Sequence, residues 1–434
     1  MRIRTICRMI IGFDDTDSKT AGMCTTYLGA LMVEEIPLPA DQVTPYLLRL
    51  NPNVRFKTRG NAAVSLRFEL GRKETDEMWR ICCDLLEEFA VFDDENTNPG
   101  IVFLSEEQAS GLRGELEAFS LRAVRDFITI DETKKFLKKH NIKHRGYKNG
   151  RGLIGALAAA SFAFNGLIDW TYEFIAYRKP ENWEEKRSLD EETVWTADTA
   201  SYPRTWDTVD HQNNQIVFSP HGPDPVLFGI RGSDQSAIKD AFTIVRSEPI
   251  DRYLMYTTNQ GTDMHITKTN IADAKEGRSY KIGGRVTAPP HTIRGGHVIF
   301  TVEDGSERVD CAAYEPTKNF RDLIRRLAVG DLVTVYGAFM DRTVNLEKIR
   351  IDSLRPRMVV RNPRCGCGKR MKSAGKNQGY RCKKCRTKSD LPEIVETDPG
   401  ITVGVYETPP VARRHLAKPL IRCNSEKKNI YPSR

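Results

Sequence analysis

The chain lacks a long hydrophobic run. Its longest apolar stretch, residues 153–164, is shorter than the roughly 18 uninterrupted apolar residues that a membrane-spanning helix needs. The amino terminus is apolar for only a few residues before it reaches three acidic residues, so it does not resemble a secretion signal. Internal repeats are also absent, which excludes solenoid and propeller folds. We therefore expect a cytoplasmic protein with no membrane partner.

Two common motifs of ATP-using enzymes are missing as well. No GxxxxGK[ST] run occurs, which excludes an ordinary P-loop nucleotide site. No lysine stands in a KxDG-type motif, which a nucleic-acid ligase would need. Cysteine, in contrast, is present ten times. Without a secretion signal, such thiols are expected to be metal ligands or core residues rather than disulfides.

The charge is unevenly distributed over the 434 residues. The formal net charge is +8, yet the segment from residue 355 to the end has 20 Lys plus Arg against 6 Asp plus Glu. A basic carboxyl-terminal fifth on a mildly acidic body indicates attachment to a polyanion through that end. A solvated basic tail is the alternative. At roughly 100–200 residues per domain, the length predicts two to four domains.

The first 270 residues alternate between apolar strands and amphipathic helices, which is typical of α/β and α+β folds. The predicted strands are 8–13, 54–58, 63–70, 101–104, 171–177, 215–218 and 226–230. The predicted helices are 25–35, 73–89, 116–128, 131–140, 153–164 and 235–245. Asp131 is expected to cap the fourth helix, because its carboxylate can accept free backbone N–H groups.

From residue 280 the pattern changes to short strands. Five are predicted, at 280–287, 297–302, 308–313, 332–339 and 345–353, with a helix at 317–327 between the third and fourth. This order predicts a five-stranded OB-fold, and a generic small β-barrel is the alternative. OB-folds bind unpaired nucleotides by stacking and backbone charge. Phe300, Tyr336 and Phe339 are candidates for stacking, although each also suits the barrel core.

An acidic turn follows the first predicted strand. Asp14, Asp15 and Asp17 lie within four residues and repel one another unless a cation or several donors neutralise them. Such a turn can hold magnesium, which normally arrives with nucleotide phosphates. The next segment places a glycine and two hydroxyls at a helix start, a favourable phosphate position. A solvated turn that caps the helix is the alternative. The candidate phosphate-binding residues here are Thr16, Ser18 and Gly22.

Three further segments are candidate sites. Lys57, Arg59, Gly60 and Asn61 form a polar turn that could clamp phosphate or merely close a hairpin. Gly152 precedes a helix rich in alanine, where an anion site and close helix packing both select glycine. His221 and Asp224 lie in a Pro/Gly loop between two apolar strands, and Asp207 and Asp210 nearby are candidates for holding a cation or a basic ligand.

Four cysteines have metal-ligand spacing. Cys365 and Cys367 are followed, after fourteen residues rich in Lys, Arg and Gly, by Cys382 and Cys385. Two such pairs predict a structural zinc ribbon with four thiolate ligands. The first pair is C-x-C rather than C-x-x-C. An OB-fold followed by a basic zinc ribbon indicates nucleic-acid binding, with RNA that has unpaired loops, and not DNA, as the expected ligand.

Several motifs together resemble those of a known family. They are IGFDDTDS, GMCTTYLGAL, KTRGNAAVSLRF, GRGLIGALAA, TYEFIAYR, SPHGPDPVLFGIRG and NPRCGC…GYRCKKC, in this order. The chain is similar, from residue 1 to about 420, to the archaeal tRNA(Ile) 2-agmatinylcytidine synthetase (TiaS) family. The resemblance implies a multidomain α+β protein in which an α/β kinase-like domain and a ferredoxin-like domain precede an OB-fold and a zinc ribbon. We expect these at 1–105 (completed by part of 200–265), 106–270, 278–355 and 360–390, followed by a basic tail at 391–434.

The resemblance also implies a reaction. The family modifies the wobble cytidine of the isoleucine tRNA with a CAU anticodon, so that it reads AUA. ATP phosphorylates the 2-carbonyl oxygen of that cytidine, agmatine displaces the phosphate, and AMP is a product. The self-phosphorylated threonine of the family matches Thr25. Asp14, Asp15 and Asp17 are then expected to hold magnesium. The residues expected to contact ATP phosphates are Lys57, Arg59, Gly60 and Asn61. Those expected to lie near agmatine are Gly152, His221 and Asp224.

Two rival functions remain at this stage. A non-catalytic tRNA-binding protein would need only the OB-fold and the ribbon, and it would leave the acidic turn without a role. A different ATP-dependent nucleic-acid enzyme is the other candidate. Self-labelling with ATP in the absence of RNA separates an enzyme of the resembled family from a binding protein.

Overall fold

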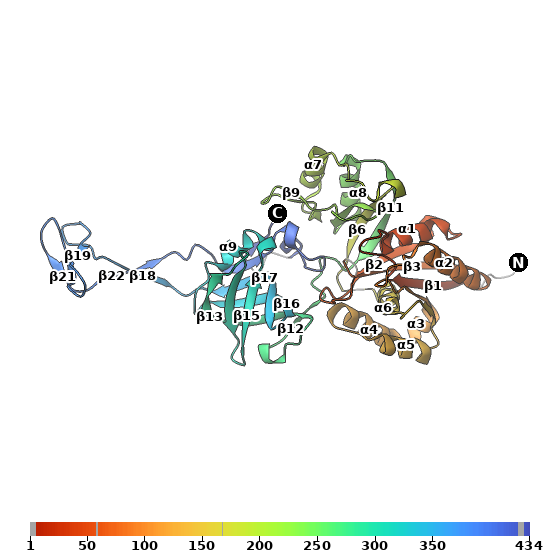
Figure 1. Ribbon diagram of the computed structural model, residues 1–434, viewed down its shortest axis with the longest axis horizontal. Coiled ribbons are helices and arrows are strands. Elements are labelled where there is room, and N and C mark those ends of the chain that lie inside the picture. Colours follow the sequence, from red (N-terminus) through yellow and green to blue (C-terminus); the bar gives the residue numbers. More distant parts are fainter. Residues whose placement is uncertain (1–5, 58–59, 167, 424–428) are drawn as a thin grey trace.

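The computed structural model describes residues 6–57, 60–166, 168–423 and 429–434. Its body contains a nine-stranded sheet that carries the amino-terminal half of the chain (Figure 1). In sheet order the strands are β5 (Lys143–Gly146), β4 (Gly100–Ser105), β1 (Ile6–Asp14), β3 (Ala62–Gly71), β2 (Thr44–Arg49), β11 (Ile250–Thr258), β6 (Thr171–Arg178), β10 (Val226–Gly232) and β7 (Thr205–Trp206). All neighbours are antiparallel except β2 and β11, which pair in parallel at the centre.

Helices cover both faces of this sheet. On β1, Ile11 and Phe13 face the core that α1 (Thr25–Glu35) and α2 (Thr75–Phe89) close, whereas Ile10 faces the opposite core. That second core contains residues of α3 (Glu106–Gly111), α4 (Arg113–Arg125), α5 (Ile130–Lys139) and α6 (Gly152–Asn165). The alternation follows from the two-residue period of a strand. Two more helices, α7 (Glu191–Ser201) and α8 (Gln235–Ile244), cover the β6–β10 half.

The OB-fold prediction is confirmed. Strands β13 (Arg278–Thr292), β14 (Val298–Glu303), β15 (Arg308–Ala313), β16 (Leu332–Met340) and β17 (Thr343–Ser353) form a barrel, with α9 (Phe320–Ile324) between β15 and β16. The barrel closes through the pairs β13–β16 and β15–β17. Three short strands extend this sheet: β12 (Ile266–Lys268), β23 (Gly404–Glu407) and β24 (Ile430–Tyr431). A separate short hairpin joins β8 (Val209–Asp210) and β9 (Gln215–Ile216).

A two-stranded ribbon carries the cysteine-rich segment away from the body (Figure 1). It consists of β18 (Arg357–Arg361) and β22 (Glu393–Thr397). At its far end lies a small sheet of β19 (Lys372–Ser373), β20 (Tyr380–Arg381) and β21 (Lys388–Ser389). The predicted zinc ribbon is therefore a distinct module beside the OB-fold.

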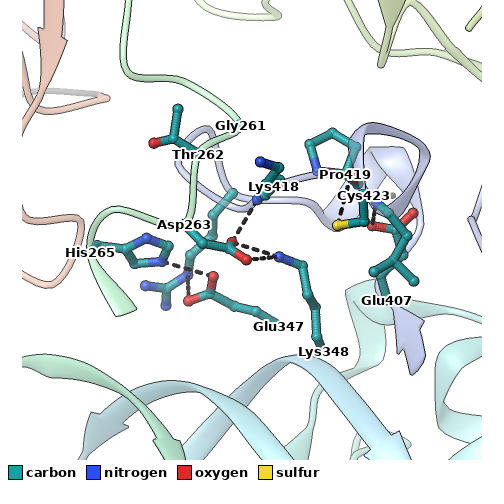
Figure 2. Close-up of polar contacts among 12 residues, drawn as sticks. Gly261, Thr262, Asp263, His265, Glu347, Lys348, Glu407, Lys418, Pro419 and Cys423 are labelled. Atoms are coloured by element: carbon teal, nitrogen blue, oxygen red, sulfur yellow. Dashed lines mark hydrogen bonds and ion pairs between the residues drawn. The ribbon is translucent and has the colours of Figure 1, made fainter. Parts of the chain in front are cut away.

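The segment of residues 404–423, which we call the C-terminal strap, packs against the body. Buried Arg413 pairs with Asp207 and, at 2.9 Å, with Glu407. The backbone N–H of Lys418 donates a hydrogen bond of 2.6 Å to the Asp263 carboxylate (Figure 2). The same carboxylate forms an ion pair of 2.5 Å with Lys348 of the OB-fold. The strap thus joins the sheet body, through Arg413 and Asp207, to the OB-fold, where β23 pairs with β17.

Several predicted elements are wrong in detail. Residues 54–57 form no strand; the strand lies earlier, at β2, where Pro45 interrupts the apolar pattern. Thr129 caps α5 in place of Asp131, by accepting from Glu132 N–H at 3.2 Å. The helix predicted at 317–327 is reduced to α9, while α7 and β11 were not predicted. No helix in the described part of the chain is long and apolar enough to cross a membrane.

Candidate active site

A cavity of about 1290 Å³ lies where the two halves of the large sheet, the edge of the OB-fold and the C-terminal strap meet. It is larger than the roughly 300–1000 Å³ typical of a single-ligand pocket. Many of the residues predicted from the sequence line it together: Asp14, Asp15, Asp17, Thr25, Lys57, Gly60, Asn61, His221 and Asp224. These residues come from segments more than two hundred positions apart, so the fold gathers them into one site.

The acidic turn lies at the end of β1. Asp14 is partly buried and accepts the backbone N–H of Asp15 at 2.7 Å. Burial, together with the neighbouring Asp15 carboxylate, raises the pKa of Asp14 well above its usual range. Asp15 has a positive φ of 62° and accepts two hydrogen bonds of 2.8 Å from the guanidinium of Arg151. Burial raises the pKa of Asp15, although Arg151 opposes the shift.

The first turn of α6 packs directly against Asp14. A Cβ at Gly152 would lie 2.5 Å from the Asp14 carbonyl oxygen, and a Cβ at Gly155 would lie 1.9 Å from Asp14 Oδ2. Only residues without a side chain allow this approach. Gly152 therefore permits close packing of the helix on the acidic turn, and it is not among the residues that line the cavity.

Thr25 is the first residue of α1 and is buried in the cavity wall. Its Oγ1 accepts a hydrogen bond of 3.0 Å from Thr16 Oγ1. Ser18 Oγ donates to Asp94 at 2.5 Å, and Ser18 N–H donates to the Gly22 carbonyl at 3.2 Å. Thr16, Ser18 and Gly22 thus hold the loop between β1 and α1, and Thr25 presents its hydroxyl next to the acidic turn.

The polar turn after β2 is also tied to its own loop. Lys57 Nζ donates to the Pro52 carbonyl, and burial lowers the pKa of Lys57. Asn61 Nδ2 donates to the Asn51 carbonyl at 2.8 Å. Gly60 lies against Arg49, whose Nη1 would be 2.5 Å from a Cβ at that position. Arg59 lies outside the described residues.

The sequence did not reveal a further charged cluster in the cavity wall. Buried Glu173 of β6 pairs with Arg231 of β10 at 3.0 Å and with Arg49 of β2 at 3.5 Å. Burial disfavours the Glu173 carboxylate, but Arg231 and Arg49 outweigh it and lower its pKa. His415 of the C-terminal strap completes this wall, and Arg49 together with burial lowers its pKa. No local motif marks these residues, because each lies on a different strand or segment.

The loop predicted as a substrate site lies at the same cavity. His221 is exposed there, and Asp224 forms an ion pair of 3.3 Å with Arg187. Asp207 and Asp210 are not in the cavity wall. Asp207 pairs with Arg413, and Asp210 accepts from the side-chain amide of Asn213 at 3.0 Å.

The four ribbon cysteines converge. Their sulfur atoms all lie within 4.8 Å of one another, with Cys365 and Cys385 at 3.2 Å and Cys367 and Cys382 at 3.6 Å. Tetrahedral zinc with Zn–S bonds of about 2.3 Å requires sulfur atoms roughly 3.8 Å apart. The residues therefore fit a zinc ion, and the C-x-C spacing does not prevent the four thiols from meeting.

Two of the three aromatic residues proposed for base stacking belong to the barrel core. Phe300 is fully buried and Phe339 is 9 % exposed. Tyr336 is partly buried, with Lys281 Nζ 5.3 Å from its ring centroid. The exposed aromatic side chains near the cavity are instead Phe56 and Phe127.

Comparison with known proteins gives matches over the whole chain. The TiaS TCKD domain family matches residues 10–149, the TiaS FLD domain family residues 150–265, the OB-fold nucleic acid binding domain family residues 280–351, and the TiaS C-terminal zinc ribbon domain family residues 362–399. The isoleucine-tRNA 2-agmatinylcytidine synthetase TiaS of Methanosarcina mazei is 48 % identical over 433 residues, covering 98 % of this chain and all of that protein.

Solved structures agree with this result. A complex of TiaS with its isoleucine tRNA and ATP is 45 % identical with a TM-score of 0.87, and a complex of TiaS with that tRNA, AMPCPP and agmatine is 41 % identical with a TM-score of 0.84. Each alignment covers 98 % of this chain and all of the compared chain. With four matched domain families in the order that the fold shows, the chain belongs to the TiaS family.

Proposed function

We propose that this chain is a 2-agmatinylcytidine synthetase that acts on the isoleucine tRNA with a CAU anticodon. It uses ATP to activate the 2-carbonyl oxygen of the wobble cytidine and then joins agmatine to C2. The observation that carries the proposal is the single cavity that brings the acidic turn, the Thr25 hydroxyl and the OB-fold edge together. A tRNA-binding protein without catalysis would not need several carboxylates and a threonine hydroxyl in one cavity.

The acidic turn is the proposed phosphoryl-transfer centre. Asp14, Asp15 and Asp17 are the residues that would hold magnesium, because hard cations prefer carboxylate oxygens. Bound there, the ion would neutralise charge on the transferring phosphate. The fit rests on the donor set, because the three carboxyl groups lie within four residues and all line the cavity. Arg151 holds Asp15 in place through two hydrogen bonds.

Thr25 is proposed as the residue that accepts phosphate from ATP. Its hydroxyl lies at the amino-terminal end of α1, where free backbone N–H groups favour negative charge. The Thr16 hydroxyl donates a hydrogen bond of 3.0 Å to the Thr25 hydroxyl oxygen. Phosphopeptide mapping after reaction with ATP tests this role. Phosphate on Thr25 that disappears in Asp15→Ala is the expected result, and phosphate confined to Thr26 would refute it.

The second half-reaction replaces phosphate with an amine. The agmatine nitrogen forms a bond to C2 and loses a proton, while the C2–O bond breaks and phosphate leaves with the former carbonyl oxygen. A dicationic ligand needs carboxylates near its path. We propose His221 and Asp224 as neighbours of agmatine, since both line the cavity that contains the acidic turn.

The carboxyl-terminal half is proposed to hold the tRNA. The OB-fold edge residues 276–277 and 340–342 reach the cavity, which places RNA bound on the barrel beside the reaction centre. The four ribbon cysteines are the proposed zinc ligands and keep the outer module folded. A tRNA substrate also implies that the protein acts in the cytoplasm.

The function is tested by agmatine incorporation. The full chain is incubated with ATP, magnesium, labelled agmatine and a CAU-anticodon isoleucine tRNA transcript, and label in precipitated RNA is counted. Incorporation is expected with this transcript and is expected to be absent when the wobble cytidine is replaced by guanosine. Equal labelling of both transcripts, or none with either, would refute the proposed reaction.

A further inference from the structure

Two phenylalanine side chains of the cavity wall are exposed. Phe56 is 76 % exposed and Phe127 is 45 % exposed, although both line the cavity that contains the acidic turn. Large apolar side chains in water are unfavourable unless a ligand covers them. Packing within the chain therefore does not explain why these two side chains are exposed.

Phe56 lies in the loop between β2 and β3, and the base of this loop is fixed. Buried Asn51 donates both hydrogens of its amide, to the Asp126 carbonyl at 3.2 Å and to the Gly277 carbonyl at 3.0 Å. Asn53 Nδ2 donates to Ser279 Oγ at 3.0 Å. The loop that carries Phe56 is thus attached to the end of α4 and to the first strand of the OB-fold.

Phe127 follows Asp126, the C-cap residue of α4, at the helix end to which the Phe56 loop is attached. A Cβ at Gly277 would lie 2.3 Å from Phe127 Cε2, so the ring rests directly on the glycine backbone. The preceding residue, Asp126, receives two hydrogen bonds from Arg278, at 2.8 and 2.6 Å. The backbone that bears Phe127 is therefore held against the OB-fold, while the side chain stays 45 % exposed.

Cationic side chains line the same cavity as the two rings. They are Arg55, Lys57 and Arg342. Arg55 reaches Asp341 on the β16–β17 hairpin at 3.8 Å, which bridges the loop tip and the OB-fold edge. Exposed aromatic rings beside positive charges are the combination by which proteins bind unpaired nucleotides, because rings stack on bases and cations contact phosphates.

We propose that Phe56 and Phe127 form a stacking subsite for an unpaired anticodon base that flanks the wobble cytidine. The inference rests on the proposed function, which requires the cytidine to leave its stack and enter the cavity. Stacking of the neighbouring base on the rings compensates for the stacking that is lost in the anticodon loop. The subsite thereby orients the loop so that the cytidine points toward the acidic turn.

The test compares Phe56→Ala, Phe127→Ala and the conservative Phe56→Tyr in the full chain. Stacking on an aromatic side chain is worth about a 5- to 150-fold change in affinity per base. We expect each alanine variant to weaken tRNA binding within this range and to raise the KM for tRNA, while Phe56→Tyr retains binding. Tyr253→Ala is the matched control, since Tyr253 is 60 % exposed on β11 and lies outside the cavity wall.

Abasic RNA distinguishes stacking from a general effect on the fold. Two transcripts carry an abasic sugar on the 5′ or the 3′ side of the wobble cytidine. Phe56→Ala is expected to weaken binding of the intact transcript and of one abasic transcript, and to leave binding of the other abasic transcript unchanged. Equal losses with all three transcripts, or no loss with any, would overturn the subsite. Failure of the unaltered protein to modify intact tRNA would instead contradict the proposed function.

Discussion

Gly155→Ala tests whether the position of the Asp14 carboxyl group is essential. The added Cβ would lie 1.9 Å from Asp14 Oδ2, whereas ordinary contacts begin at 3.4 Å, so the carboxyl group has to move by about 1.5 Å. A displacement of roughly 1 Å in a reacting constellation can cost on the order of 10²-fold in rate. We expect phosphoryl transfer to Thr25 to fall by about that factor, measured as the initial rate of self-labelling with ATP.

The same substitution changes stability only modestly. Overpacking costs typically about 1–3 kcal/mol, and the helix propensity of alanine over glycine returns up to about 1 kcal/mol. Affinity for tRNA should remain within about twofold, because the OB-fold and the ribbon are untouched. Gly114→Ala is the matched control: it is also a helical glycine, in α4, and an added Cβ there meets no atom within 4 Å. Full activity of a folded Gly155→Ala variant would refute the role of Asp14.

Three further predictions concern the carboxyl-terminal half. Burial opposes ionisation of Glu347, but His265, 2.9 Å away, outweighs it and lowers the pKa of Glu347 to about 2, from 4.5 (Figure 2). The Glu347 carboxylate therefore stabilises the fold above pH 4.5, and the free energy of unfolding is expected to fall by about 3 kcal/mol as the pH falls from 4.5 to 2. In urea unfolding, Glu347→Gln should show a flatter dependence of this free energy on pH. Cys382→Ser is expected to lose zinc by metal analysis and to bind tRNA more weakly, and retention of zinc would contradict the ribbon assignment. Arg413→Ala leaves the Asp207 carboxylate buried without its guanidinium, so urea unfolding should show a loss of about 3–5 kcal/mol, and a loss below about 1 kcal/mol would disprove the strap's role.

Contiguous features were predictable from the sequence. The strand that ends at Asp14 and the helix that begins at Thr25 form one local unit, so periodicity alone located both. The OB-fold strands and the paired cysteines have the same advantage, because each signal lies within a short segment. The domain limits and the roles of the individual site residues stay predictions.

Long-range pairing was not predictable. Strand β11 pairs with β2 at Thr257 and Tyr46, across more than two hundred residues, and this parallel pair joins the two halves of the sheet. The bond between Arg151 and Asp15 spans 136 residues, and nothing near either residue indicates the other. Non-local contacts of this kind depend on how whole elements pack, which a local pattern does not encode.

The central claim is the identity of the modified nucleoside. The most direct measurement is mass spectrometry of the anticodon fragment from CAU-anticodon isoleucine tRNA after reaction with the full chain, ATP and agmatine. The account predicts that the wobble cytidine, and no other nucleotide, gains the mass of agmatine less one water. A wobble cytidine of unchanged mass, or a gain at another nucleotide, would contradict it.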